Sequence, residues 1–257
     1  MNGAFYIGAT GLNAQQRGLD VIANNVANIN TLAFKRTEMR FSELLSPPVD
    51  ANQSADNVRP SANISNGVKS TEAMRIYEQG DLRQTRNPLD LAIQGDGFVE
   101  VLGPNGTSLL WRGGSLSIGE DGYLQTESGL TLRNLIQVPE DATELRIDRE
   151  GKIFALTASD SSTVEIGAID IVMPANRMAL QVSGSGYYTV EDSASVRSFV
   201  PGEEGKGVFV QGAVETSNVE LTEEMVALLL MQRAYAANAQ VVQAGDQLML
   251  IANGLRR

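Results

Sequence analysis

The stretch of sequence that decides the fold is residues 227–255, ALLLMQRAYAANAQVVQAGDQLMLIANGL. Steps of alternately three and four residues reach only apolar side chains, namely Ala227, Leu230, Ala234, Ala237, Val241, Ala244, Leu248, Ile251 and Leu255. Such a heptad stripe predicts a helix that packs along one face. Glu223 and Glu224 come just before it, where the helix dipole favours negative charge, and Gly254 suits its C-terminal end.

The length of this helix indicates a helical partner. With N-cap candidates at Ser217, Asn218 and Thr222, the helix spans about 35 residues, or about 50 Å. A helix this long outgrows a small globular core, which favours coiled-coil-like pairing within the chain or between chains. A core helix that packs on its own domain is the alternative.

The N-terminus offers a second helix as that partner. Residues 5–28 contain no proline, and small or apolar side chains recur at heptad spacing at Phe5, Ala9, Leu12, Leu19, Ala23 and Val26. The asparagine-rich stretch NNVANINT at residues 24–31 is expected to end this helix, because Asn tolerates the left-handed conformation. The two terminal helices are therefore predicted to pair.

The middle of the chain has the pattern of β-structure. Residues 46–70 start with Pro47-Pro48 and predict a long irregular connection, either a flexible linker or a loop that orders against a partner. After it, short alternating segments are separated by turn signals such as Gly95-Asp96-Gly97. The expected strands are residues 89–93, 98–102, 109–111, 115–118, 123–125, 145–147, 153–156, 164–172, 187–190 and 208–210.

The predicted fold class is therefore α+β. Residues 1–45 and 212–257 form a coiled-coil-like helical domain, residues 46–75 form an extended linker or loop, and residues 76–211 form a central all-β domain of the sandwich or barrel type. In this arrangement the β domain is an insertion between the two helices.

The composition excludes several classes of function. The 257 residues include no cysteine and no histidine, which removes disulfides, thiolate and imidazole metal sites, and His-dependent catalysis. The formal net charge of −11 argues against nucleic acid or an anionic membrane as a partner. No apolar run approaches the length of a membrane span, and residues 1–16 carry no charge, so no cleaved signal peptide is expected.

Candidates for chemistry are few, and we predict no catalytic, cofactor-binding or metal site. The Gly95-Asp96-Gly97 stretch lacks the spacing of a phosphate-binding loop and is better explained as a hairpin turn. A β domain that acts on the cell wall is the alternative, and it would need carboxylates facing a cleft, such as Asp96, Asp121 or Glu150.

Three stretches resemble the bacterial flagellar rod and hook protein family. Residues 24–31 with Phe34-Lys35-Arg36 resemble its N-terminal signature, and residues 212–219 (GAVETSNV), followed by 232–235 (QRAY), resemble its C-terminal signature. Residues 80–98, which include the stretch LDLAIQGDGF, are similar to the start of the family's β domain. The length and the unbroken tail are most similar to the distal-rod members, with the proximal-rod members as the alternative.

The resemblance implies a structural subunit and not an enzyme. In this family the terminal helices line an axial tube, the β domain lies outside them, and the subunits polymerise helically into the drive shaft that carries torque from motor to hook. The implied partners are further copies of the chain, other rod and hook proteins, the flagellar export apparatus and the rings around the rod. The implied location is the flagellar basal body, across the periplasm, with no cofactor.

Two sets of residues follow from the pattern and the resemblance. The expected self-assembly interface on the terminal helices consists of Leu12, Leu19, Val26, Leu230, Ala234, Ala237, Val241, Ala244, Leu248 and Ile251. The residues that match the family motifs are Asn24, Asn25, Asn28, Thr31, Phe34, Ser217, Asn218, Gln232 and Arg233. Ala33 stands where the family commonly has Gly, so a positive φ there would cost about 1 kcal/mol.

Overall fold

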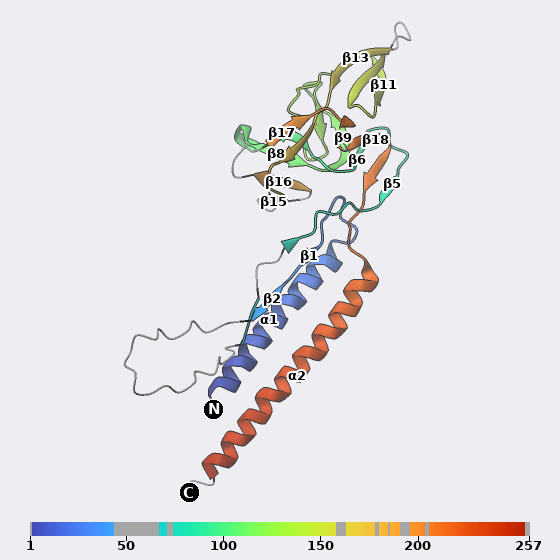
Figure 1. Ribbon diagram of the computed structural model, residues 1–257. Helices are drawn as coiled ribbons and strands as arrows, with labels where there is room; N and C mark the ends of the chain where they lie inside the picture. Colours follow the sequence, from blue (N-terminus) through green and yellow to red (C-terminus); the bar gives the residue numbers. More distant parts are fainter. Residues whose placement is uncertain are drawn as a thin grey trace, which may run out of the picture. The chain divides into compact units, whose positions relative to one another are not determined.

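A computed structural model describes residues 2–43, 67–70, 74–157, 163–177, 180–184, 186–190, 196–203 and 206–254 (Figure 1). The chain forms two compact units. The helical unit contains residues 1–27, 37–75 and 220–257, and the β unit contains residues 28–36 and 76–219. Most of the predicted linker, residues 46–75, lies outside the described residues.

The helical unit is built on the two terminal helices, α1 (Asn2–Ala27) and α2 (Leu221–Gly254), which pack together (Figure 1). The predicted pairing of the termini and the α+β class are thereby confirmed. Four short strands accompany the helices: β1 (Thr37–Glu38), β2 (Phe41–Glu43), β3 (Val68–Ser70) and β4 (Met74–Arg75). Strand β1 pairs with β4 and strand β2 with β3, each antiparallel, and β3 contacts α1.

Neither helix, over the residues that the structure describes, contains a stretch long and apolar enough to cross a membrane.

Over the residues that the structure describes, the β unit consists of short strands with a 3₁₀ turn, η1 (Pro104–Gly106). The strands are β5 (Leu82–Gln84), β6 (Asp90–Gln94), β7 (Val99–Leu102), β8 (Ser108–Trp111), β9 (Gly113–Ile118), β10 (Leu124–Thr126), β11 (Ala142–Ile147), β12 (Lys152–Thr157), β13 (Thr163–Ala168), β14 (Ile171–Pro174), β15 (Leu180–Gly184), β16 (Tyr187–Val190), β17 (Val196–Phe199), β18 (Val208–Gln211) and β19 (Ala213–Glu215).

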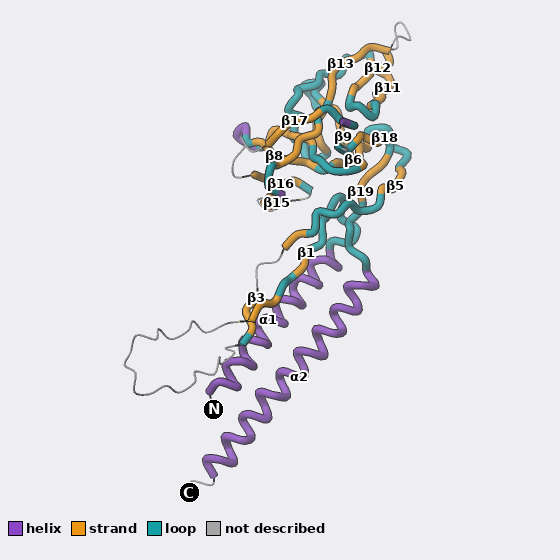
Figure 2. The backbone as a smooth tube through the Cα atoms, viewed as in Figure 1, coloured by secondary structure: helices purple, strands orange, loops and turns teal. Residues whose placement is uncertain are grey.

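These strands form antiparallel sheets, shown as orange segments in Figure 2. Within the described residues, two sheets have four strands, in the orders β10-β9-β6-β18 and β15-β16-β8-β7. The sheet β11-β12-β13 and the pairs β14-β17 and β19-β5 complete the unit. The central core gathers side chains from most of these strands, including Leu91, Trp111, Leu124, Ile153 and Phe209.

The longest predicted strand was wrong in extent. Residues 164–172 were expected to form a single strand, whereas the structure has β13 and β14 with a break at Ile169-Asp170. The backbone N–H of Ile169 donates instead to the carbonyl of Gly151 at 2.8 Å. The chain turns there to leave the β11-β12-β13 sheet and pair β14 with β17.

Candidate functional site

The two helices approach each other closely because glycines of α1 face α2. A Cβ atom built on Gly8 would lie 2.5 Å from Cγ2 of Val242, and one built on Gly11 would lie 2.9 Å from Nδ2 of Asn238. At separations of this size, Val242 or Asn238 would have to shift to admit a side chain at the glycine it faces. The order of the contacts makes the helix pair antiparallel.

The apolar stripe of α2 lies beside this contact and stays uncovered. Leu230, Val241, Leu248 and Ile251 are 57–63% exposed. The sequence pattern left two partners open for this stripe, a helix of the same chain or a helix of another. Since α1 covers the neighbouring face through Asn238 and Val242, these four residues stay about 60% exposed, and together they form an apolar surface that no other part of the described chain covers.

The other side chains of the predicted assembly interface are smaller or more covered. On α1, Leu12, Leu19 and Val26 are half-buried. On α2, Ala234 is half-buried, whereas Ala237 and Ala244 are exposed. The predicted set therefore divides into half-buried positions on α1 and a mostly exposed stripe on α2.

A buried asparagine marks the end of α1. The side-chain amide of Asn25, which is 2% exposed, donates to the backbone carbonyl of Thr37 at 2.9 Å and to Oε1 of Glu224 at 3.0 Å. Its Oδ1 atom accepts from the Thr37 N–H at 2.9 Å. Asn25 thereby joins α1, β1 and the first turn of α2 within the helical unit.

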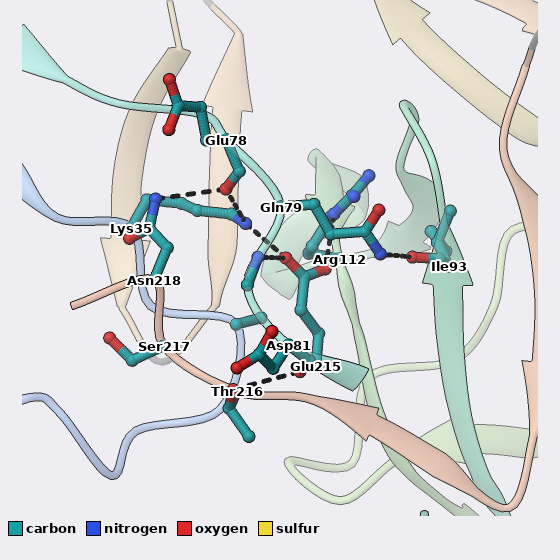
Figure 3. A network of polar contacts seen from close by, with 12 residues as sticks. Lys35, Glu78, Gln79, Asp81, Ile93, Arg112, Glu215, Thr216, Ser217 and Asn218 are labelled. Carbon is teal, nitrogen blue, oxygen red and sulfur yellow. Dashed lines mark hydrogen bonds and ion pairs between the residues drawn. The ribbon is translucent and has the colours of Figure 1, made fainter. Parts of the chain in front are cut away.

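In the β unit, the carboxylate of Glu215 is the centre of a buried ion cluster (Figure 3). Oε1 accepts from Nζ of Lys35 and from the N–H of Gly80 at 3.0 Å, and Oε2 accepts from Nε of Arg112 at 2.9 Å. The side chain of Glu215 is fully buried, and those of Lys35 and Arg112 are 2% and 5% exposed. Residues far apart in the sequence therefore meet at one carboxylate.

Arg112 also fixes the turn that follows β6. Its guanidinium donates to the carbonyls of Gly95 and Gly97, which both have positive φ values, 104° and 138°. The stretch around Asp96 is thus a structural turn held by an arginine. The hairpin interpretation was wrong, because the strands on either side do not pair: β6 pairs with β9 and β18, whereas β7 pairs with β8 in another sheet.

Asn218 adds three hydrogen bonds next to this cluster. Its Oδ1 accepts from the N–H of Arg36 at 2.6 Å, and its Nδ2 donates to the carbonyls of Ile76 at 3.0 Å and Glu78 at 3.1 Å. The carbonyl of Glu78 also accepts from Nζ of Lys35 at 2.7 Å. We call Lys35, Arg112, Glu215 and Asn218 the clasp.

The clasp contains more positive than negative charge, because Lys35 and Arg112 share the one buried carboxylate of Glu215. Burial lowers the pKa of Lys35 from its ordinary value of 10.5, and the carboxylate of Glu215 opposes this shift. Arg112 also disfavours the charged lysine, since like charges repel in a dry environment. Removing Glu215 would therefore leave two buried cations facing each other, the costly way to break a buried ion pair.

Several family-motif residues have local roles in the structure. The hydroxyl of Thr31 donates to Oδ1 of Asn28 at 3.1 Å, and Oγ of Ser217 accepts from the N–H of Val219 at 3.2 Å. The remaining motif residues outside the clasp and the helix junction are half-buried Phe34 and exposed Asn24, Gln232 and Arg233.

Ala33 occupies a left-handed backbone conformation with φ of 54°. Its N–H donates to the carbonyl of Glu215 at 2.9 Å, and its Cβ is buried. This is the backbone geometry that the expected glycine would adopt without strain.

The carboxylates named for an enzymatic alternative have ordinary surroundings. Asp96 forms an ion pair with Arg177 at 2.7 Å, and this contact lowers the pKa of Asp96 below its usual 3.8. Asp121 and Glu150 lie in hairpin turns, at Gly119–Gly122 and Asp148–Gly151. A recess of about 380 Å³ in the β unit is lined by other residues, among them Glu100 and Asp170.

No group of three acidic residues that could hold a metal ion comes together in the part of the chain that the structure describes.

The clasp was not predicted from the sequence, although three of its four members, Lys35, Glu215 and Asn218, lie in the motif stretches. The signal that could have found it is a charged residue directly after apolar ones, as in Ala33-Phe34-Lys35 and Ala213-Val214-Glu215. A charge so placed falls on the buried side of a segment and needs a partner of opposite sign.

Comparison with known proteins gives matches over most of the chain. Residues 5–35 match the family model described as flagella basal body rod protein. Residues 92–155 match the D1 domain of the flagellar hook protein FlgE/F/G, and residues 210–255 match the C-terminal region of the flagellar basal body rod FlgEFG protein.

Curated proteins similar to this chain include flagellar basal-body rod proteins FlgG from three bacteria. The chain is 34% identical to the FlgG of Buchnera aphidicola subsp. Acyrthosiphon pisum, over 96% of each chain. It is 34% identical to the FlgG of Borreliella burgdorferi, over 99% of this chain and 98% of that protein. It is also 34% identical to the FlgG of Caulobacter vibrioides, over 96% and 97% respectively.

Proposed function

Because the chain belongs to the flagellar basal-body rod family, we propose that it is a structural subunit of the flagellar rod, in the distal section, and that it polymerises through its helical unit. The distal position follows from relatives named FlgG that match over nearly the whole chain. In this role the subunit carries torque and performs no catalysis.

The observation that carries the proposal is the uncovered apolar stripe of α2. Burying the exposed part of Leu230, Val241 or Leu248 against another helix would gain about 1–2 kcal/mol for each side chain. The alanines on the same stripe allow another helix to approach closely. The best occupant is the helical unit of a second copy, because a contact between different faces of identical copies generates a filament wherever its rotation does not close into a ring.

The further partners in this proposal are neighbouring rod and hook proteins, the rings around the rod and the flagellar export apparatus. The absence of cysteine is compatible with passage of an unfolded chain through a narrow export channel. The proposed location is the periplasm-spanning part of the basal body.

The direct test is electron cryo-microscopy of purified hook–basal bodies, with mass spectrometry of the same sample. We expect the chain to be traced as a repeating subunit in the distal rod, with Leu230 and Val241 against a neighbouring copy. Intact basal bodies that lack the peptide would contradict the proposal.

The stripe itself is tested with the separate variants Leu230→Asp and Val241→Asp. Each places a charge on the proposed interface and should abolish incorporation into basal bodies while the β unit stays folded. The matched control is Gln243→Asp, which puts the same charge on an exposed polar position of α2. Normal incorporation of both stripe variants would exclude this surface as the interface.

A further inference from the structure

We propose that the clasp is a tether for helix pairing: it fixes the segment that follows α1 against the segment that precedes α2, so that the two helices meet as neighbours in one chain. This inference concerns the folding of the single chain and does not depend on the rod function.

The chain passes between its two units at four places, namely residues 27/28, 36/37, 75/76 and 219/220. Three of these crossings, at 36/37, 75/76 and 219/220, lie at the ends of segments that the clasp joins inside the β unit. The N–H of Ile76 donates to the carbonyl of Arg36 at 3.0 Å, and the side chain of Asn218 binds both residues. Lys35 and Glu215 then link the same segments through a buried ion pair.

Side chains provide much of the attachment between the segment that follows α1 and the segment that precedes α2, because the first of these has no regular secondary structure. Residues 28–36 belong to no helix or strand. Two backbone bonds tie this segment to the C-terminal one: Ala33 N–H to Glu215 at 2.9 Å and Asn218 N–H to Phe34 at 3.3 Å. The ion pair and the Asn218 amide therefore supply the side-chain part of the attachment of residues 33–36, beside these two bonds and the bond from Ile76 N–H to the carbonyl of Arg36.

Holding the two segments together matters because it sets the effective concentration of α1 near α2, and this concentration determines how often the two helices meet. When both segments are held, α1 and α2 start from neighbouring anchor points. When residues 28–36 are released, a flexible stretch separates α1 from its anchor, and the local concentration falls as the span grows.

The absence of cysteine from the chain allows a direct experiment. The double variant Gly11→Cys/Asn238→Cys places two thiols across the helix contact, where a Cβ on Gly11 would lie 3.6 Å from Cγ of Asn238. The rate of intrachain disulfide formation in dilute protein then reports how often the helices meet. Trp111, the chain's single tryptophan, is buried in the β unit and reports separately whether that unit is folded.

Two changes break the clasp in this background. Lys35→Met releases the N-terminal segment but leaves Glu215 bound to Arg112 and Gly80, and Glu215→Gln removes the central charge. We expect each to slow intrachain disulfide formation about tenfold while Trp111 keeps its native fluorescence. The matched controls are Lys152→Met and Glu100→Gln, the same chemical changes at β-unit positions outside the clasp, and they should leave the rate unchanged.

Two results would overturn the proposal. If Lys35→Met and Glu215→Gln cross-link at the rate of the parent, the clasp does not tether the helices. If both variants lose the native fluorescence of Trp111, the cluster is needed for the fold of the β unit itself and has no separate tethering role. If Glu215→Gln alone loses this fluorescence, Lys35→Met decides.

Discussion

The amide of Asn25 lies 3.0 Å from the carboxylate of Glu224, although 199 residues separate the two in the sequence. Both side chains are buried, at 2% and 6% exposure, in the region where the last turn of α1 meets the first turn of α2. A buried hydrogen bond costs little free energy while both groups are paired, but breaking it leaves a buried polar group without a partner. This contact therefore favours the one register of the helix pair in which Asn25 and Glu224 meet. An apolar contact would tolerate sliding.

Replacing Asn25 with Ala should therefore destabilise the helix pair by roughly 2–4 kcal/mol, because Glu224 and both backbone groups of Thr37 lose a partner. The measurement is denaturant unfolding of the full chain followed by far-ultraviolet circular dichroism. Asn13→Ala, at an exposed position of α1, is the control and should change stability by less than about 0.5 kcal/mol. Equal effects of the two variants would show that the buried contact contributes nothing specific.

The glycine contact predicts a rescue. Gly8→Ala should weaken helix pairing although Ala favours helix, since its Cβ would lie 2.5 Å from the stiff side chain of Val242. Adding Val242→Ala removes the obstructing atoms and should restore pairing, with α1 more helical than before. Thermal unfolding of the two single variants and the double variant measures the coupling between the sites. Additive effects would mean that the two residues do not touch.

The sequence was informative where a pattern repeats. The two terminal helices and most of the β hairpins follow from heptad spacing and from Asn-Gly or Asp-Gly turns, and strand β16 begins and ends where the alternation does. Strands β5, β15, β17 and β19 of the β unit were missed, because no Asn-Gly or Asp-Gly turn marks their ends, whereas the equally short β10 follows Asp121-Gly122. The break between β13 and β14 depends on a distant partner, Gly151, which no local pattern reveals.

The candidate site likewise has a part that the sequence predicts and a part that only the folded structure shows. A stripe on α2 is visible in the sequence, but its exposure depends on which face α1 covers, and that is decided by the glycines at positions 8 and 11. The clasp joins Lys35 to Glu215 across 180 residues, so its existence is a property of the folded chain. Local sequence could suggest only that each charge needs a partner.

The left-handed conformation of Ala33 predicts a substitution that stabilises the protein, in contrast to the destabilising changes at Asn25 and Gly8. Ala33→Gly should stabilise the β unit by about 1 kcal/mol, because glycine adopts a φ of 54° without strain. Urea unfolding followed by Trp111 fluorescence measures the change. Ala213→Gly, at a buried position in strand β19, is the control and should destabilise, since there glycine relieves no positive φ, adds freedom to the unfolded chain and removes a buried methyl group. Destabilisation by Ala33→Gly would mean that the buried Cβ contributes more than the strain costs.

Leu135 tests the same principle without a buried side chain. Its φ is 45° and its side chain is 53% exposed, so little packing is lost on truncation. Leu135→Gly should stabilise the β unit by about 1 kcal/mol in the same assay. A loss of stability would show that the exposed leucine makes favourable contacts that outweigh its backbone strain.

The ion pair between Asp96 and Arg177 makes the stability of the β unit depend slightly on pH in the acidic range. The hydrogen bond from Arg177 lowers the pKa of Asp96 below 3.8, so the folded state binds this proton less readily than the unfolded chain. The contribution is fully present above the unfolded pKa and is lost as the pH falls through the lower folded value. Since both side chains are 40–53% exposed, it should amount to less than about 1 kcal/mol.

Arg177→Gln should raise the pKa of Asp96 toward 3.8 and remove its part of the stability change below about pH 4. Nuclear magnetic resonance titration of the Asp96 carboxyl carbon measures the first effect, and urea unfolding at several acidic pH values measures the second. Arg197→Gln, which removes another exposed arginine of the β unit, should leave the Asp96 titration where it is. An unchanged pKa in Arg177→Gln would mean that the ion pair is not populated in solution, and the low pKa would then have to come from the more distant charges of Arg112 and Lys206.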